Sequence, residues 1–301
     1  MRRLDRSTRA NILTLLVEGM SVNATARVTG ISKPTVLKLL TDIGPAVAEF
    51  QGDAMRDLHC QQVQVDEIWS YVGMKAKNVP AERRGEFGIG DVYTFTAIDP
   101  DTKLAPTWLV GQRDTANAQR FLLDLGRRIR GRFQLTTDAA SFYREAVIEA
   151  FGATVDYAQL QKLYATPQGA ERSYSPPECI ATRPEIIHGT PDESHISTSH
   201  VERQNLTMRM SMRRFTRLTN AFSKKVYNLS CAVALHFMHY NFVRPHSTLT
   251  KAANGRPTTP AMAAGIETAP WTMADVVCLL EEREEDAREV SKRRKDLKDQ
   301  T

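Results

Sequence analysis

The chain has 301 residues and a net charge of +5, and 42% of its residues are hydrophobic while 25% are charged. This composition excludes extensive disorder, the length fits about two domains, and no apolar run reaches the roughly 18–20 residues of a membrane-spanning helix. The start of the chain lacks the apolar segment of a secretion signal and the four scattered cysteines form no C-x-x-C pair, so we expect a cytoplasmic protein with no membrane partner and no zinc finger.

Residues 1–45 are predicted to form an N-terminal all-α helix-turn-helix domain. Ala26, Gly30 and Val36 have the required spacing, since a small residue lets two helices approach, glycine permits the left-handed turn, and valine packs back on the first helix. A generic helical hairpin is the alternative. In the first interpretation the helix at about 33–40 enters the major groove of DNA and offers three contacts: Lys33, Thr35 and Lys38.

Residues 46–60 are interpreted as a helical linker, and residues 61–250 as an α/β domain. Its pattern predicts a meander of three strands, followed by a helix, a strand, a second helix and a fifth strand. These elements cover 62–73, 92–99, 104–111, 115–129, 132–138, 141–152 and 154–161. We therefore expect a five-stranded mixed sheet with flanking helices.

The second half of the domain begins with a Pro-, Gly- and Ser-rich segment, 165–197, which is predicted to be a long insertion loop. Two long helices are expected next, at about 198–218 and 223–242. Residues 251–301 form a C-terminal extension with a densely charged helix.

Three acidic residues occupy positions that favour chemistry. Asp66 lies within an apolar strand, Asp138 ends the fourth strand, and Glu202 begins a helix. If the first and fourth strands are neighbours, the two aspartates can face each other, and a helix packed beside them can supply the glutamate. Converging carboxylates repel unless a cation lies between them, and oxygen ligands favour Mg²⁺ or Mn²⁺. Two such ions could hold the attacking and leaving oxygens of a phosphodiester.

Each acid also has a structural interpretation. Asp66 could pair with an arginine, Asp138 could cap the following helix, and Glu202 could be an exposed helix residue. Glu67 is the rival of Asp66, because strand alternation places the two on opposite faces and cannot decide between them. His195 and His200 are interpreted as hydrogen-bonding or DNA-contact residues rather than as metal ligands.

A basic block indicates a polyanion partner. Residues 203–256 contain ten Lys or Arg and no Asp or Glu, so the remainder of the chain is net acidic. Arg209 follows Glu202 by seven residues and therefore lies on nearly the same helix face. A carboxylate followed by cations along one face would suit a DNA strand entering a metal site, although a solvated helix face is the alternative.

Three segments resemble the insertion-sequence-one type of transposase. They are DEIWSYVGMKAKN at 66–78, TTDAASFYREA at 136–146 and SHVERQNLTMRMSMRRFTRLTNAFSKK at 199–225. This type belongs to the wider DDE transposase/integrase superfamily, whose members have an RNase H-like fold. The resemblance covers about residues 60–250. The chain departs from the type in its long spacing between Asp138 and Glu202 and in having no N-terminal zinc module.

The resemblance implies an RNase H-like catalytic core that binds two Mg²⁺ or Mn²⁺ ions through Asp66, Asp138 and Glu202. The implied activity is DNA transposition in a mobile element, by cleavage at the transposon ends and transfer of the 3′-OH strand into target DNA. The implied partners are double-stranded DNA, as terminal inverted repeats and target, and further copies of the chain in a homodimer or larger oligomer. The expected DNA-binding residues of this core and its basic block are Arg203, Asn205, Arg209, Arg213, Arg214, Arg217, Lys224 and Lys225.

Two other functions remain open at this point. A DNA-binding regulator descended from such an enzyme would keep the acids for structure only, and it would show no metal dependence at Asp66 or Asp138. A nuclease of the same fold would hydrolyse DNA without joining strands.

Overall fold

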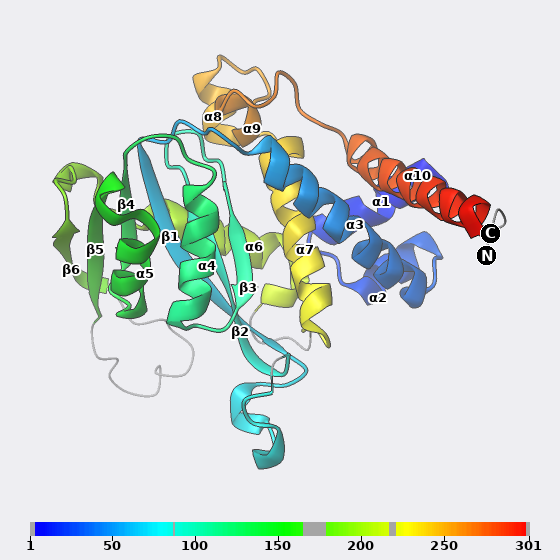
Figure 1. Ribbon diagram of the computed structural model, residues 1–301, viewed down its shortest axis with the longest axis horizontal. Helices are drawn as coiled ribbons and strands as arrows, with labels where there is room; N and C mark the ends of the chain where they lie inside the picture. The colour runs from blue at the N-terminus through cyan, green and yellow to red at the C-terminus, as the bar shows by residue number, and fades with distance from the viewer. Residues whose placement is uncertain (1–3, 87, 165–178, 217–220, 299–301) are drawn as a thin grey trace. The chain divides into compact units, whose positions relative to one another are not determined.

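The computed structural model describes residues 4–86, 88–164, 179–216 and 221–298, and its chain divides into two compact units (Figure 1). The sheet unit comprises Arg56–Trp69 and Val92–Leu206. The helical unit comprises Met1–Met55, Ser70–Asp91 and Thr207–Thr301. Among the described residues, no helix combines the length and the apolar character needed to cross a lipid bilayer.

A mixed sheet with the strand order β3-β2-β1-β4-β5-β6 forms the centre of the sheet unit. Strands β1, β4 and β5 run parallel to one another, whereas β2 pairs antiparallel with β3 and β5 pairs antiparallel with β6. The predicted mixed sheet is therefore confirmed. The strands are β1 (Gln62–Val72), β2 (Gly90–Ile98), β3 (Trp108–Gly111), β4 (Phe133–Asp138), β5 (Val155–Tyr164) and β6 (Cys179–His188).

Within the described residues the sheet has six strands rather than the expected five. Strand β6 lies inside the segment 165–197, which the composition predicts to be a loop, while residues 165–178 of that segment lie outside the described part of the chain. Eight of the ten residues of β6 are exposed, and the strand contains Pro184. An exposed edge strand has no buried face, so it lacks the alternation by which a strand is recognised in a sequence.

Helices α4 (Thr115–Gly126) and α5 (Phe142–Phe151) cover one face of the sheet, in front of it in Figure 1. Their contact is aromatic: the ring of Phe95 on β2 lies 5.8 Å from Phe121 and 6.4 Å from Tyr143, and all three side chains are fully buried. Asp114 caps α4 by accepting the backbone N–H of Asn117. The aromatic core thus fixes the helix that follows the end of β4.

The helical unit begins with α1 (Arg6–Val17), α2 (Val22–Thr29) and α3 (Lys33–Ala54). Gly30 follows α2 with a φ of +69°, a left-handed conformation that favours glycine. Ser32 caps α3, and Val36 in its first turns is fully buried. The spacing of Gly30 and Val36 therefore reflects a turn and a packing contact.

Helix α3 continues well beyond residue 40 and passes through Pro45. Proline cannot donate a hydrogen bond to the carbonyl four residues before it, here that of Thr41. The hydroxyl of Tyr227 donates to this carbonyl oxygen instead, at 3.3 Å. Residues 46–54 of the expected linker thus belong to the same helix as residues 33–45.

The second half of the chain is largely helical. Helix α6 (Ser199–Ser211) ends earlier than the sequence suggests and is followed by a short 3-10 helix, Arg213–Phe215. Helix α7 (Val226–Met238) continues into a π-helical turn, His239–Val243, that stops two residues before Pro245. The remaining helices are α8 (Ser247–Ala252), α9 (Pro260–Ala263) and the charged α10 (Met273–Lys298).

Candidate active site

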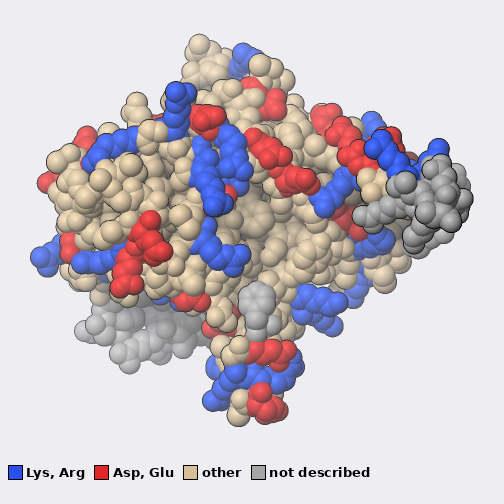
Figure 2. All heavy atoms as spheres, in the orientation of Figure 1, with Lys and Arg blue, Asp and Glu red and all other residues tan. Residues whose placement is uncertain are grey.

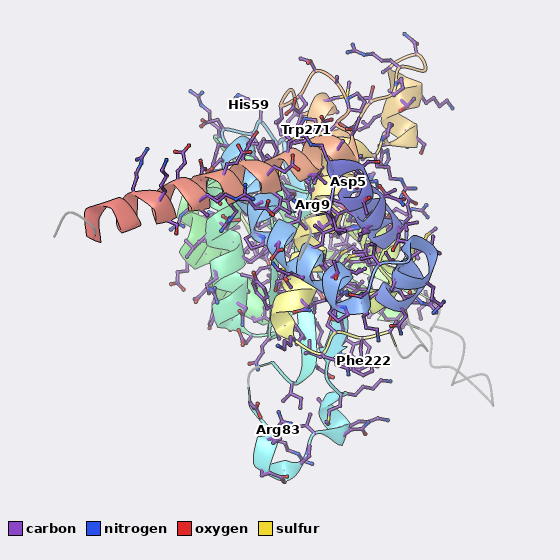
Figure 3. The ribbon with its side chains drawn as sticks, turned by 90° about the vertical axis from the view of Figure 1, so that its right-hand side faces the viewer. Asp5, Arg9, His59, Arg83, Phe222 and Trp271 are labelled. Atoms are coloured by element: carbon purple, nitrogen blue, oxygen red, sulfur yellow. The ribbon has the colours of Figure 1, made fainter. Side chains whose placement is uncertain are left out.

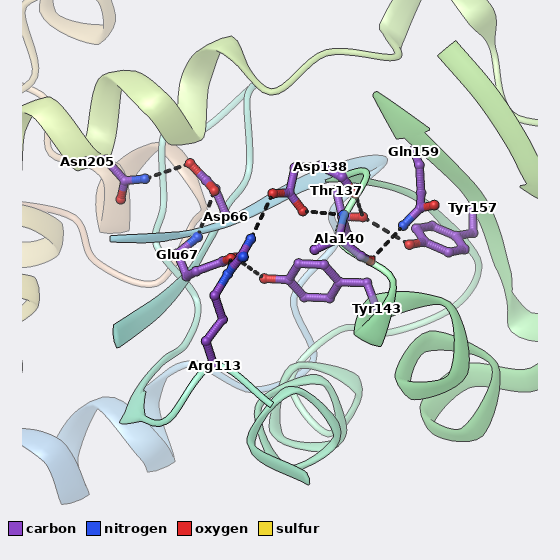
Figure 4. Close-up of polar contacts among 10 residues, drawn as sticks. All are labelled: Asp66, Glu67, Arg113, Thr137, Asp138, Ala140, Tyr143, Tyr157, Gln159 and Asn205. Atoms are coloured by element: carbon purple, nitrogen blue, oxygen red, sulfur yellow. Dashed lines mark hydrogen bonds and ion pairs between the residues drawn. The ribbon is translucent and has the colours of Figure 1, made fainter. Parts of the chain in front are cut away.

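The pairing of β1 with β4 brings Asp66 and Asp138 together. The two parallel strands pair Gln64 with Thr136, so two residues further along the same register Asp66 lies opposite Asp138. The condition that the first and fourth strands are neighbours is therefore met, and the two aspartates lie at one end of β4 (Figure 4).

Glu67 joins these two aspartates. One oxygen from each of Asp66, Glu67 and Asp138 lies within 4.8 Å of the other two, which makes them a group that could hold a metal ion. The Glu67 side chain is 3% exposed, and its carboxylate forms an ion pair with Arg113 and accepts a 2.8 Å hydrogen bond from the hydroxyl of Tyr143. Alternation along β1 left Asp66 and Glu67 as rivals, but the structure brings both carboxylates into the cluster.

Burial, and then the charges of neighbouring carboxylates, raise the pKa values of two acids in the cluster. Burial, followed by the charges of Glu67 and Asp138, raises the pKa of Asp66 to about 7. Burial is also the main cause that raises the pKa of Glu67, against the opposing effect of Arg113. Burial raises the pKa of the Tyr143 phenol well above its usual value, so this hydroxyl stays protonated and remains a donor.

Both aspartates are oriented by donors from other elements. Asp66 accepts hydrogen bonds from the side-chain amide of Asn205 on α6 and from the backbone N–H of Glu67, both at 2.8 Å. Asp138 accepts one from the backbone N–H of Ala140 at 3.0 Å, and Arg113 lies 3.4 Å from its other oxygen. Arg113 therefore contacts both Glu67 and Asp138 (Figure 4).

Glu202 is not a member of this cluster in the structure. Its carboxylate forms an ion pair with Lys162 on β5 and accepts a 2.5 Å hydrogen bond from the Thr198 hydroxyl. The ammonium group of Lys162 also acts on Asp66, because its charge is among the causes that lower the pKa of that aspartate. Lys162 thus connects Glu202 electrostatically to Asp66.

The start of α6 is held against β1. The side-chain oxygen of Gln64, two residues before Asp66, accepts hydrogen bonds from the backbone N–H groups of His200 and Val201 at 2.8 and 3.2 Å. Gln64 is 2% exposed, so these bonds satisfy free donors at the helix N-terminus away from solvent. They set the position from which Glu202 and Asn205 extend, while the Nδ1 atom of His200 lies 3.4 Å from Lys103.

The donor set fits a divalent cation with a preference for oxygen ligands. All the candidate ligands are carboxylates, and these are the oxygen ligands that Mg²⁺ and Mn²⁺ prefer. Two basic side chains pair with acids here: Arg113 with Glu67, and Lys162 with Glu202. The sequence motifs did not reveal either basic residue, because each lies more than 20 residues from the acids that it contacts.

The comparisons with known proteins found no matching protein family and no matching curated protein. Among solved structures, the Mos1 transposase in a paired-end complex with the left transposon end matches with 15% identity and a TM-score of 0.21, over 52% of this chain and 60% of the Mos1 chain. A piggyBac transposase synaptic complex with hairpin DNA matches with 11% identity and a TM-score of 0.38, over 94% and 73%. At these values the likeness establishes neither the fold nor the activity of this chain.

The residues expected to bind DNA lie in both units. Arg203 and Asn205 belong to the sheet unit, and Asn205 contacts Asp66. In the helical unit Lys33 is exposed, the Thr35 hydroxyl is hydrogen-bonded to Ser32, and Lys38 forms an ion pair with Asp42. Arg217 lies outside the described residues, and the other expected contacts in the helical unit are Arg209, Arg213, Arg214, Lys224 and Lys225.

Proposed function

We propose that the protein is a DNA transposase with an RNase H-like catalytic core. The observation that carries the proposal is the register of β1 and β4, which sets Asp66 opposite Asp138, with α6 held beside them by Gln64 and Asn205. This is the pairing of acids that the sequence resemblance implies. The basic block that follows Glu202 supports a nucleic-acid substrate.

In this proposal Asp66, Asp138 and Glu202 hold two Mg²⁺ or Mn²⁺ ions. When bound, these ions would stabilise negative charge on the attacking and leaving oxygens of a phosphodiester. Glu202 would exchange its ion pair with Lys162 for a place among the metal ligands. Glu67, which is buried against Arg113 and Tyr143, would position Arg113 and through it Asp138.

The proposed reaction has two steps. Water attacks the phosphodiester at the end of the mobile element, which leaves a 3′-OH on the element and a 5′-phosphate on the flanking DNA. This 3′-OH then attacks a phosphodiester of target DNA, forms a new phosphodiester bond and displaces the 3′-OH of the target strand. Asn205 and the backbone N–H of Glu67 would keep Asp66 oriented during both steps. Arg203, Arg209 and the basic residues after them would bind phosphates, while α2 and α3 would read the terminal repeats through Lys33, Thr35 and Lys38.

The joining of two ends in one reaction calls for at least two active sites, so the proposal includes a homodimer or a larger assembly. Its partners are the terminal inverted repeats and the target DNA, both double-stranded. The protein would act in the compartment that contains the DNA of the mobile element.

The decisive experiment incubates the purified protein with Mn²⁺ and a plasmid that carries the DNA flanking its reading frame, and maps 3′ ends and joined products. We expect cleavage and joining by the wild type and neither by Asp138→Ala, with end binding retained. Asp53→Ala removes an exposed aspartate of α3 and is the matched control, which should cleave normally. Cleavage by Asp138→Ala would refute the site.

The same experiment separates the two alternatives. A DNA-binding regulator would bind the ends with or without Mn²⁺ and leave the plasmid intact. The ion pair between Glu202 and Lys162 is the observation that favours this reading, because it leaves the glutamate with a partner of its own. A nuclease would produce cut ends without joined products.

A further inference from the structure

A cavity of about 280 Å³ is lined entirely by residues of the helical unit, none of which belongs to the carboxylate cluster. Its walls come from the first three helices, from the segments 212–214 and 221–224, and from α7. Its apolar lining includes Leu16, Val17, Leu37, Leu40, Met212 and Leu235. The volume is near the lower end of the roughly 300–1,000 Å³ of small-molecule sites, which suits a group the size of one nucleotide rather than a helix or a peptide.

The cavity is also lined by cationic side chains. These are Lys33, Arg213, Arg214 and Lys224, and no acidic residue is among the described residues of the lining. Arg214 is half-buried, and one of its terminal nitrogens donates a 2.7 Å hydrogen bond to the hydroxyl of Ser223. Burial lowers the pKa of this guanidinium to about 10, and no carboxylate of the described residues forms an ion pair with it. An apolar interior bordered by unpaired cations fits a ligand with a flat apolar body and an attached anion.

An aromatic pair connects this cavity to a second hollow. Phe222 lines it, and its ring lies 5.1 Å from the ring of Tyr71 at an angle of 31°. The ammonium group of Lys75 lies 5.9 Å from the Tyr71 ring, and a second hollow beside the first is lined by Tyr71, Lys75, Lys77 and Phe222. The short helices Ala76–Asn78 and Ala81–Arg83 belong to a projecting segment, which we call the arm. Figure 3 shows Phe222 near the base of this arm and Arg83 farther out along it. Half-buried aromatic rings among lysines provide faces on which nucleobases stack.

The backbone holds this arrangement in place. Gly73 donates its N–H to the carbonyl oxygen of Ser223 at 2.9 Å, and Val72 forms a β-bridge with the same residue. Ser223 is 2% exposed and lies between Phe222 and Lys224, so the aromatic ring and the cation are presented from a fixed segment. A preformed site loses less conformational entropy when it binds its ligand.

We propose that this cavity and the Phe222–Tyr71 pair bind an unpaired DNA strand. One unstacked base enters the cavity, its neighbour stacks on Phe222, and the phosphates between them contact Arg214 and Lys224. Bases within a duplex are stacked on each other and cannot reach a cavity or an aromatic face. DNA as the ligand class rests on the proposed function, but a site for an unpaired strand adds to it, because cleavage at transposon ends requires only duplex recognition and the carboxylates.

The test measures binding of a fluorescein-labelled 15-nucleotide single strand by anisotropy in EDTA, with the duplex of the same sequence alongside. We expect Phe222→Ala to weaken binding of the single strand at least about fivefold, since stacking contributes about 1–3 kcal/mol per base. Arg214→Met should reduce the slope of log K against log salt by about 0.7. The duplex should lose less than twofold in Phe222→Ala, which removes a stacking face and no charge.

The matched control is Arg83→Gln, which removes an exposed cation of the same arm that is paired with Glu86. Figure 2 shows that the arm carries both positive and negative side chains. Removal of one positive charge should therefore change the net charge of the arm little, and binding of the single strand should stay within twofold of the wild type. Phe222→Leu keeps an apolar side chain without a stacking face, and thermal melting checks that each variant is folded. In the wild type, 2-aminopurine placed along the strand should show one position of raised fluorescence, where the base has left its neighbours.

The outcomes are distinct. Equal affinity of Phe222→Leu and wild type for the single strand, or no position of altered 2-aminopurine fluorescence, would overturn the proposal. Competition by a nucleoside monophosphate at concentrations that displace the strand would assign the cavity to free nucleotides and would also overturn it. Because the assay contains no metal, failure of Mn²⁺-dependent cleavage would refute the proposed function and leave this binding result unaffected.

Discussion

Asn205 donates its side-chain N–H to the carboxylate of Asp66 at 2.8 Å, and this bond joins two residues 139 positions apart in the chain. Glu202 lies three residues before Asn205 on α6, and residues three apart lie on the same side of a helix. The bond therefore sets Glu202 and Asp66 on facing elements. In our proposal, this arrangement would allow Glu202 to join Asp66 as a metal ligand.

Replacement of Asn205 by Ala should weaken metal binding and cleavage together. Loss of the donor leaves Asp66 free to rotate and further raises its pKa, so the Mn²⁺ concentration for half-maximal cleavage should rise about 10–100-fold, as for other residues that orient metal ligands. Asn11→Ala, at an exposed position of α1, should have no effect. Unchanged Mn²⁺ dependence in Asn205→Ala would show that the hydrogen bond has only a structural role.

Lys162 competes with metal ions for the acids in our proposal, so Lys162→Met should bind Mn²⁺ more tightly. Removal of the ammonium group frees Glu202 and increases the negative charge around Asp66. Titration followed by the electron paramagnetic resonance of free Mn²⁺ should show a several-fold lower Kd, with exposed Lys251→Met as the control. Weaker binding by Lys162→Met would mean that the lysine holds Glu202 in place for the metal instead.

The sequence predicts a mixed sheet and most of its strands, because these have clear apolar patterns, and it predicts that Asp66 and Asp138 can face each other if the first and fourth strands are neighbours. It does not predict β6, whose exposed residues and proline resemble a loop. The sequence also does not predict that α3 continues through Pro45. The hydroxyl that donates to the Thr41 carbonyl belongs to Tyr227, which lies on a helix far away in the sequence.

Sequence patterns also do not predict the ion pairs around the site. Glu67 could be recognised as a candidate, but strand alternation does not specify which of two neighbouring carboxylates faces Asp138. Its burial depends on Arg113 and Tyr143, and the partner of Glu202 lies 40 residues away on β5. Such contacts depend on the tertiary structure, and no local motif encodes them.

The helical unit should lose stability in mild acid because His239 is buried on the π-helical turn. Burial, with a further contribution from Arg244, lowers its pKa to about 4. A depressed pKa of the native state means that the unfolded state binds the proton first, so stability is complete above about pH 6.5 and is lost as the pH falls from there toward 4. By pH 5 the loss should be on the order of 1–2 kcal/mol for this histidine.

Urea denaturation at pH 7, 6 and 5 tests this expectation. As the pH decreases from 7 to 5, the free energy of unfolding should fall less in His239→Gln than in the wild type, because glutamine does not titrate. His59→Gln removes an exposed histidine and should keep the slope of the wild type. Equal slopes in all three proteins would contradict the assignment.

Two glycines of α3 should respond in opposite ways to replacement by alanine. A Cβ atom at Gly44 would lie 2.5 Å from the Cβ and 2.8 Å from the Cα of Cys231 on α7, so Gly44→Ala must push the two helices apart and should destabilise the protein by about 1–3 kcal/mol. A Cβ atom at Gly52 meets nothing within 4 Å, and Gly52→Ala should stabilise the helix by up to about 1 kcal/mol. Urea denaturation measures both changes, and a Gly44→Ala variant as stable as Gly52→Ala would show that α3 and α7 are not in close contact there.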